Sequence, residues 1–189
     1  MGLTPLPAGA SSAVADNLVL AHSSSYVATV IAWDPASGLA RAASSEATVV
    51  DETPPRIIGS KGVLVAAAQS DTTSMFGSWN RIDDPESGIE LLQASVLDVV
   101  GGAIVVRSVE LASTAVNVTV DDLVLLHGRR YALQVVATNG AGGVETVTSS
   151  PVIVDTSPPV PGFVLDVGDA ALTFSDQLWD ADCQHNNNT

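Results

Sequence analysis

The chain is poor in aromatic residues, in cysteine and in positive charge. Aromatic residues make up 4% of its 189 residues, and the single cysteine, Cys183, can form no disulfide within the chain. Seven Lys and Arg residues against 21 Asp and Glu residues give a formal net charge of −14. We therefore expect no binding to nucleic acid or to anionic lipid, because no basic surface can hold their phosphates. No run of about 18 apolar residues is present, so we also expect no direct insertion into a membrane.

The sequence also lacks the period of an amphipathic helix. Fifteen Gly and ten Pro residues interrupt it at short intervals, which is typical of many short strands joined by turns. Residues 35–50 are rich in Ala, and their composition alone would favour a helix. We predict a turn and a strand there instead, because the matching part of an internal repeat is rich in Gly, Thr and Val.

The repeat consists of two copies of one pattern. Residues 26–55 read YVATVIAWDPASGLARAASSEATVVDETPP, and residues 131–159 read YALQVVATNGAGGVETVTSSPVIVDTSPP. Each copy has an alternating apolar stretch, a turn with Gly, a stretch rich in Ser and Thr, and a closing Val-Asp-x-x-Pro-Pro. The two tyrosines are 105 positions apart (131 − 26) and the last prolines 104 (159 − 55). A period of about a hundred residues corresponds to one small domain, so the pattern predicts a tandem array of similar domains.

The middle of the chain, residues 56–159, is predicted to be one complete domain. Trp79 is expected to face its core, and Pro151 is expected to mark an edge or a bulge in the last strand. The candidate strands are 63–68, 75–79, 89–97, 103–111, 116–120, 131–137 and 144–154. Seven short strands at this spacing predict an all-β fold, a seven-stranded antiparallel β-sandwich.

Five residues of this region form one pattern: Trp79, Leu125, Tyr131, Ala137 and Asn139. It has a Trp in the second strand, a Leu six residues before the Tyr that opens the sixth strand, and then Val-x-Ala-x-Asn. This pattern resembles that of the fibronectin type III-like family, whose fold is immunoglobulin-like. In the earlier copy Leu20 and Tyr26 keep the spacing, while Asp34 stands at the Asn position.

The flanking parts of the chain are predicted to be incomplete modules. Residues 1–55 would hold only the later strands of a preceding module, and residues 160–189 only the first strands of a following one. Half a sandwich cannot cover both faces of its strands, so we expect a fragment of a longer chain. The linkers, 51–55 and 155–159, end in paired prolines, which favour an extended and stiff junction.

Acidic residues supply weak candidates for a calcium site. Asp83, Asp84 and Glu86 lie in one predicted turn, and calcium prefers several carboxylate oxygens. The predicted junctions add Asp51, Glu52 and Asp155, as in cadherin-like arrays, although those carry more Asp and Asn. The alternative is a solvated turn whose carboxylates accept hydrogen bonds from nearby amides.

Other candidate sites are few. Asn117 opens a glycosylation sequon, Asn-Val-Thr, on the wet face of a predicted strand, and Asn187 opens another near the end. The three histidines, His22, His127 and His185, fall in turns or at the end, and His185 with Cys183 makes too small a set for zinc. We therefore expect no cofactor, no metal centre and no enzyme.

These observations favour a non-catalytic structural or interaction module. The main hypothesis places it in a tandem-repeat extracellular or cell-surface protein, as an adhesion or spacer element whose partners are other protein modules. One alternative is an accessory domain of a secreted enzyme, for example a carbohydrate-active one. Another is a calcium-stiffened cadherin-like array. A neighbouring catalytic sequence would favour the accessory domain, and calcium titration would separate the cadherin-like array from the other two.

Overall fold

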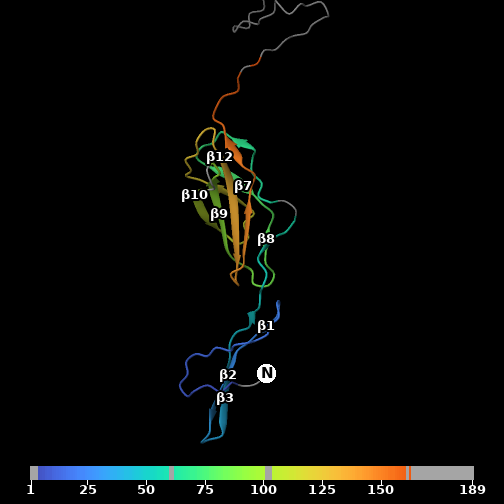
Figure 1. The fold of residues 1–189 in the computed structure, drawn as a ribbon, viewed down its shortest axis with the longest axis vertical. Coiled ribbons are helices and arrows are strands. Elements are labelled where there is room, and N and C mark those ends of the chain that lie inside the picture. Colours follow the sequence, from blue (N-terminus) through green and yellow to red (C-terminus); the bar gives the residue numbers. More distant parts are fainter. Residues whose placement is uncertain (1–3, 60–61, 101–103, 161, 163–189) are drawn as a thin grey trace, which may run out of the picture. The chain divides into compact units, whose positions relative to one another are not determined.

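The fold is all-β, as the sequence predicts. The structure, a computed structural model, describes residues 4–59, 62–100, 104–160 and 162. These residues form strands and turns arranged in several sheets (Figure 1). Within the described ranges no helix is formed that is long and apolar enough to span a membrane.

The largest sheet is built around one long central strand. Its order is β10 (Ile104–Leu111), β9 (Ile89–Asp98), β12 (Arg130–Asn139), β14 (Val152–Val154) and β6 (Ala68–Gln69), and β13 (Val144–Thr148) also pairs with β12. Strands β9 and β12 pair from Tyr131 opposite Asp98 to Asn139 opposite Ile89. The β14–β6 pair is parallel, and this is a departure from the antiparallel arrangement that we predicted.

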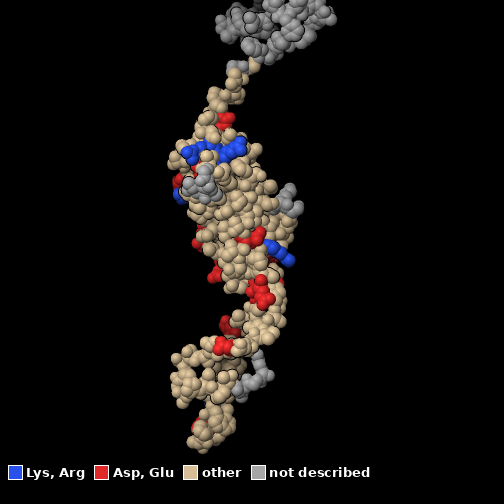
Figure 2. All heavy atoms as spheres, in the orientation of Figure 1, with Lys and Arg blue, Asp and Glu red and all other residues tan. Residues whose placement is uncertain are grey.

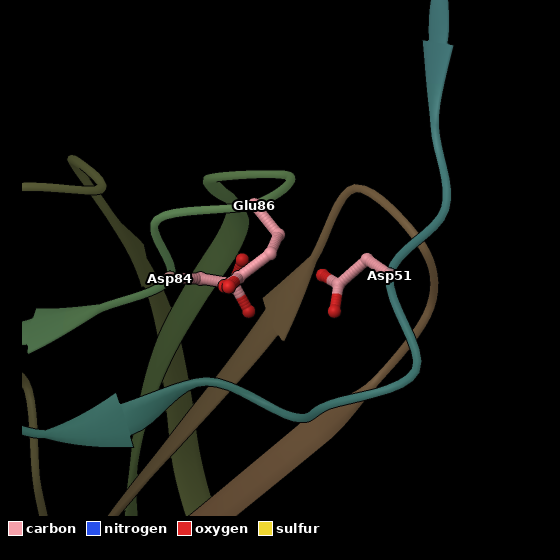
Figure 3. Close-up of side chains that lie close together, drawn as sticks. All are labelled: Asp51, Asp84 and Glu86. Carbon is pink, nitrogen blue, oxygen red and sulfur yellow. The ribbon is translucent and has the colours of Figure 1, made fainter. Parts of the chain in front are cut away.

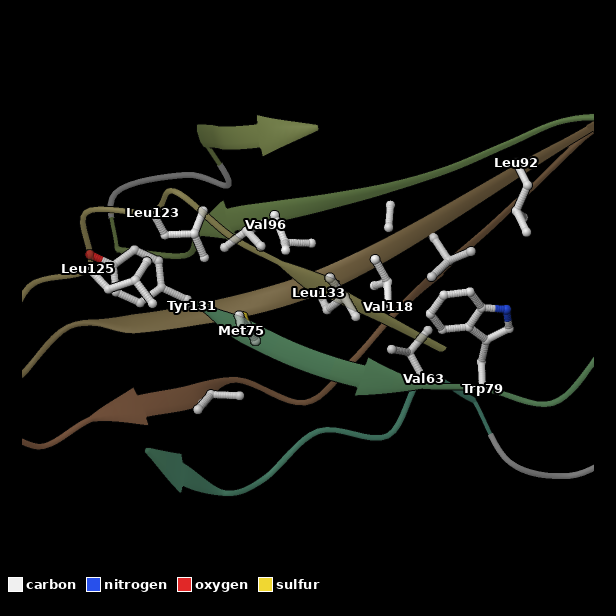
Figure 4. Close-up of a cluster of buried hydrophobic side chains, with 14 of the residues drawn as sticks. Val63, Met75, Trp79, Leu92, Val96, Val118, Leu123, Leu125, Tyr131 and Leu133 are labelled. Atoms are coloured by element: carbon white, nitrogen blue, oxygen red, sulfur yellow. The ribbon is translucent and has the colours of Figure 1, made fainter. Parts of the chain in front are cut away.

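Two smaller sheets complete this region. Strand β7 (Met75–Ser78) pairs with β11 (Asn117–Val120), and β5 (Arg56–Ile57) pairs with β8 (Ile82–Asp83). The β7–β11 pair and the central strands β9 and β12 contribute alternate side chains to one apolar core (Figure 4). Trp79 and Tyr131 lie at opposite ends of that cluster, with Met75 and Leu133 between them. The core therefore depends on strands that are distant in the sequence.

Three predicted strands differ in detail. Residues 63–68 make an isolated bridge, from Leu64 to Ser78, and then only the start of β6. The predicted strand 144–154 is interrupted into β13 and β14, and Pro151 lies in the break because it offers no amide hydrogen to a ladder. Residue 103, the first of the predicted strand 103–111, lies outside the described residues, and β10 begins at Ile104.

The earlier copy of the repeat forms two short antiparallel pairs. Strand β1 (Ser25–Tyr26) pairs with β4 (Thr48–Val49), and β2 (Thr29–Asp34) pairs with β3 (Leu39–Ser44). The strand prediction for residues 35–50 is thus confirmed, and the helix that alanine content would favour does not form. The register repeats as well, because Tyr26 opposite Thr48 corresponds to Tyr131 opposite Val152.

Candidate functional site

The two copies of the repeat share their side-chain hydrogen bonds. The Tyr131 hydroxyl accepts the Leu126 amide at 3.0 Å, and the Tyr26 hydroxyl accepts the Ala21 amide at 2.9 Å. A buried tyrosine hydroxyl needs such a backbone partner. Ser149 and Ser45 repeat in the same way, since their hydroxyls accept the amides of Leu133 and Ala28, each at 3.0 Å. The repeat is therefore structural as well as sequential.

A histidine ring accepts a backbone hydrogen bond at the start of each linker. His22 Nδ1 accepts the Glu52 amide at 3.2 Å, and His127 Nδ1 accepts the Thr156 amide at 3.0 Å. Both histidines lie in turns, as the sequence predicts, but their role at the linkers was missed. The signal was present, because Leu-Val-Leu-x-His occurs at 18–22 and again at 123–127.

The linker 51–55 is anchored through Asp51. Its side chain has no exposed surface (0%), and its Oδ2 accepts the Ser87 hydroxyl at 2.6 Å and the Asn139 amide group at 2.9 Å. Its Oδ1 accepts the Thr53 amide and hydroxyl, at 2.9 and 3.0 Å. The Ser87 hydroxyl, followed by the Thr53 amide, lowers the pKa of Asp51 below its usual value, because these donors favour the charged carboxylate.

Asn139 is the centre of this arrangement. It is fully buried at the end of β12, and its Oδ1 accepts the backbone amides of Gly143 at 2.6 Å and Ala141 at 3.2 Å. Those two bonds fix the orientation of the side-chain amide, so that its Nδ2 faces acceptors. The acceptors are Thr53 O at 2.8 Å and the Oδ2 atoms of Asp51 and Asp84, each at 2.9 Å. One side-chain amide thus joins a linker, a turn and a central strand.

Two glycines permit this close approach. A Cβ at Gly140 would lie 2.8 Å from the Ser87 carbonyl oxygen, nearer than real Cβ atoms come. A Cβ at Gly143 would lie 3.0 Å from Asn139 Nδ2 and 3.1 Å from the Pro54 Cα. A side chain at position 140 would therefore force the Ser87 backbone to shift, and one at position 143 would require Asn139 and Pro54 to move by a few tenths of an ångström.

Three carboxylates meet at this anchor (Figure 3). One oxygen from each of Asp51, Asp84 and Glu86 lies within 4.8 Å of the others. Among the ion pairs of the described residues, the only basic side chain near these carboxylates is His22, whose ring nitrogens lie 3.9 Å from Asp51 Oδ1 and 3.7 Å from Glu86 Oε1. Carboxylates gathered in this way could contribute ligands to a hard cation such as calcium.

Local donors already satisfy part of this group. Asp84 is buried, and its Oδ1 accepts the Ser87 amide at 2.9 Å while its Oδ2 accepts from Asn139. Glu86 accepts the Ser23 hydroxyl at 3.1 Å. The arrangement therefore fits a hydrogen-bonded anchor, and it fits a cation only if some of these donors give way.

The other acidic candidates lie elsewhere. Asp83 pairs with Arg81 at 2.9 Å, and the three-carboxylate group does not include it. Asp155 lies 3.6 Å from His127 Nδ1, and Glu52 contributes its amide to His22. Asn117 is exposed at the start of β11, which is compatible with the predicted sequon. On the face drawn in Figure 2, acidic side chains are scattered among a few basic ones.

The residues that carry the family resemblance differ in burial between the central region and the earlier copy. The central ones are all buried: Trp79, Leu125, Tyr131, Ala137 and Asn139. Leu20 is exposed and Tyr26 is half-buried. The Trp79 Nε1 atom has no hydrogen-bond partner among the residues that the structure describes, so this ring contributes to stability through its apolar contacts.

Comparison with known proteins yields a weak structural likeness. No protein-family model matches the chain, and no curated protein matches it. A solved structure that it resembles is the twitchin kinase region from C. elegans, described as Fn31-NL-kin-CRD-Ig26. The TM-score is 0.38 at 19% sequence identity, over 55% of this chain and 17% of that one. So low a TM-score does not establish a shared fold, and the all-β description rests on the strands themselves.

Proposed function

We propose that the chain is a non-catalytic part of a tandem array of fibronectin type III-like modules. In this proposal residues 56–159 form a seven-stranded sandwich, flanked by parts of its neighbours. The array acts as a spacer or adhesion element of an extracellular or cell-surface protein, and its partners are other protein modules. The accessory domain of a secreted enzyme stays an alternative prediction.

One observation carries the proposal, the enclosure of Asp51. Its side chain comes from the linker, yet its partners Ser87 and Asn139 belong to the domain that follows. A linker that only joined two domains would be solvated, whereas this one is bound by a buried amide and a hydroxyl. Hydrogen bonds to an ionised carboxylate are among the stronger ones in proteins, so they favour a fixed junction over a flexible one. A spacer needs such junctions.

The test measures how rigid this junction is in the full chain. Spin labels are attached to cysteines introduced by Ala43→Cys in β3 and Thr146→Cys in β13, both exposed positions, with Cys183→Ser removing the native thiol. Double electron–electron resonance should give a single narrow distribution of distances between the two labels. Asp51→Ala should broaden it, because the linker loses its anchor.

The matched control is Asp121→Ala, which removes an exposed carboxylate remote in sequence from the linker. It should leave the distance unchanged. A broad distribution in the parent chain, or a narrow one after Asp51→Ala, would contradict the proposed spacer.

A second candidate function, a calcium-stiffened junction, is favoured by the three carboxylates of Asp51, Asp84 and Glu86. Calcium at this point would join the linker to the turn directly, in place of some of the hydrogen bonds that the carboxylates now accept. Binding to the folded state alone stabilises by about 2.7 kcal/mol at a hundred times the dissociation constant.

Thermal unfolding of the full chain with and without millimolar calcium tests this candidate. Calcium should raise the Tm, and Glu86→Gln should reduce the rise while Asp121→Asn leaves it intact. Glu86 is the better target, because Asp84 also holds the turn together. An unchanged Tm over the titration would remove the calcium-stiffened alternative.

A further inference from the structure

The β2–β3 hairpin of the earlier copy has the same register as the β12–β13 hairpin of the central region. Every pair that β12 makes with β13 has an equivalent between β2 and β3. Val30 lies opposite Ala43, for example, as Val135 lies opposite Val147. The two hairpins can therefore be compared position by position, including what lies along their other edges.

The central hairpin carries a further strand on its other edge. Strand β9 lies antiparallel along β12, from Tyr131 opposite Asp98 to Asn139 opposite Ile89. Within the residues that the structure describes, β2 pairs with β3 and with no other strand. The edge of β2 that corresponds to the β9 side of β12 is therefore unpaired there. Such an edge presents backbone N–H and C=O groups that can pair with another strand.

A break in the earlier copy points to the same strand. In β12, Ala132 and Leu133 pair with β9 alone, because β14 and β13 pair with the residues on either side of them. Their equivalents, Val27 and Ala28, belong to neither β1 nor β2 and separate the two strands. The central strand is thus continuous where β9 pairs with it, and the earlier copy is interrupted at the positions that only such a strand would pair.

Apolar side chains are exposed along the same edge. Three of them are more than half exposed: Val27, Val30 and Trp33. Their equivalents in β12 lie opposite three apolar residues of β9: Leu97, Ala94 and Leu91. A strand of that composition would remove these side chains from water, which stabilises the pairing. A two-stranded hairpin alone is marginal in water, and a third strand with apolar contacts supports it.

We propose that residues 26–34 dock a separate strand of the β9 kind, antiparallel, along the edge opposite β3. The occupant is a segment of ten residues, as β9 is, with apolar residues opposite Val27, Val30 and Trp33, and a module of the same kind supplies it. Backbone hydrogen bonds provide the affinity and the apolar contacts fix the register. Docking joins β1 and β2 into one strand. This inference rests on the proposed function, because it takes the earlier copy as part of a module.

The experiment adds one such strand to the full chain. The sequence of residues 89–98 is fused through a flexible Gly/Ser linker ahead of Met1, so that it meets the edge as an intramolecular partner. The NMR chemical shifts of Val27 and Ala28 should move to values typical of a strand. The β2 amides that β3 leaves unpaired should exchange more slowly with solvent. Because these signals come from the earlier copy, an exchange of the added segment with β9 would not produce them.

Two matched controls test the contact from either side. Leu91→Asp and Leu97→Asp in the added segment alone should return both shifts to those of the chain without the extension. Val30→Asp in the chain should do the same, while Val124→Asp, at an exposed valine of the central region, should leave the docked shifts unchanged. Unchanged shifts along β3 verify that the Val30→Asp hairpin still forms.

The outcomes separate this inference from the spacer proposal. Shifts of Val27 and Ala28 that do not move in the extended chain, or that move equally in Val30→Asp, overturn the docking edge. The spin-label test of Asp51 uses the chain without the extension, so a narrow distance that broadens with Asp51→Ala keeps the spacer when docking fails. Docking without any response to Asp51→Ala would overturn the spacer and leave the docking edge standing.

Discussion

The two copies of the repeat have the same backbone and opposite surroundings. Both form the tyrosine hydroxyl bond, the serine hydroxyl bond and the same strand register. Yet Val135 in β12 is 0% exposed, whereas Val30, its equivalent in β2, is 60% exposed. The hydrogen-bonded pattern is therefore encoded within about thirty residues of the repeat itself. Burial is not, because it depends on strands that lie far away in the sequence.

The difference in burial comes from the strands that pack against each copy. Along β12 the side chains are covered by β9, β7 and β11, which contribute to the same core. In the described structure β2 pairs only with β3, and both strands are exposed along their length. Apolar side chains contribute to stability only when they leave water, at about 25 cal/mol for each Å² buried. Equivalent substitutions in the two copies should therefore have unequal effects.

The largest contrast is expected between the tryptophans. Trp79 is 5% exposed in the core, and Trp33 in β2 is 65% exposed. Trp79→Ala should lower the free energy of unfolding by roughly 3–5 kcal/mol, because it leaves a large cavity. Trp33→Ala should change it by about 0.5 kcal/mol or less, as exposed substitutions usually do. Chemical denaturation followed by circular dichroism measures both. Equal effects would show that Trp33 of the earlier copy is as buried in solution as Trp79, which belongs to the core that covers the later copy.

A smaller contrast is expected between the tyrosine hydroxyls. Tyr131→Phe leaves the partly buried Leu126 amide without its acceptor and should cost about 1–3 kcal/mol. Tyr26→Phe removes the same bond where it is exposed, so water can replace it, and the cost should be about 0.5 kcal/mol. Tm values of the two variants give the comparison. A larger cost at Tyr26 would mean that the earlier copy is more enclosed than its exposed strands indicate.

The repeated elements were predictable because their causes are local. Alternation of apolar residues identified β11 and β12, and the Leu-to-Tyr spacing identified Tyr131, whose hydroxyl accepts the Leu126 amide. The repeat also decided correctly against a helix in residues 35–50. Each of these inferences needed only a short stretch of sequence.

The linker anchor could not be predicted in the same way. Asp51 was recognised as a junction residue and Asp84 as a turn residue, but no local pattern states that they meet. Their contact depends on Asn139, whose amide is oriented by a turn formed around Gly143. Long-range contacts of this kind are decided by how three segments pack. The parallel pairing of β14 with β6 was missed for the same reason.

The smallest expected effect is on how stability depends on pH. It compares Asp51, whose carboxylate is bonded by another segment of the chain, with Asp34, whose carboxylate is bonded within its own turn. Asp51 and Asp34 both have a lowered pKa, Asp51 first through the Ser87 hydroxyl from another segment and Asp34 first through the Ser37 hydroxyl of its own turn. A pKa lowered by folding adds stability above the unfolded value of about 3.9, and this is lost as the pH falls through the folded value. Asp34 keeps part of its bond whenever its turn forms, so its contribution to the pH dependence should be the smaller.

Urea unfolding at pH 7 and near pH 3 checks this, with the difference between the two pH values as the readout. Asp51→Asn should reduce that difference, and Asp34→Asn should reduce it less. Other lowered carboxyls, Asp71 and Asp98, contribute equally to every variant and cancel in the comparison. Ser87→Ala should reproduce most of the effect of Asp51→Asn, and the two changes together should add little, because both remove one bond. Additive effects would show that the Ser87 hydroxyl is not what holds the linker carboxylate in its charged form.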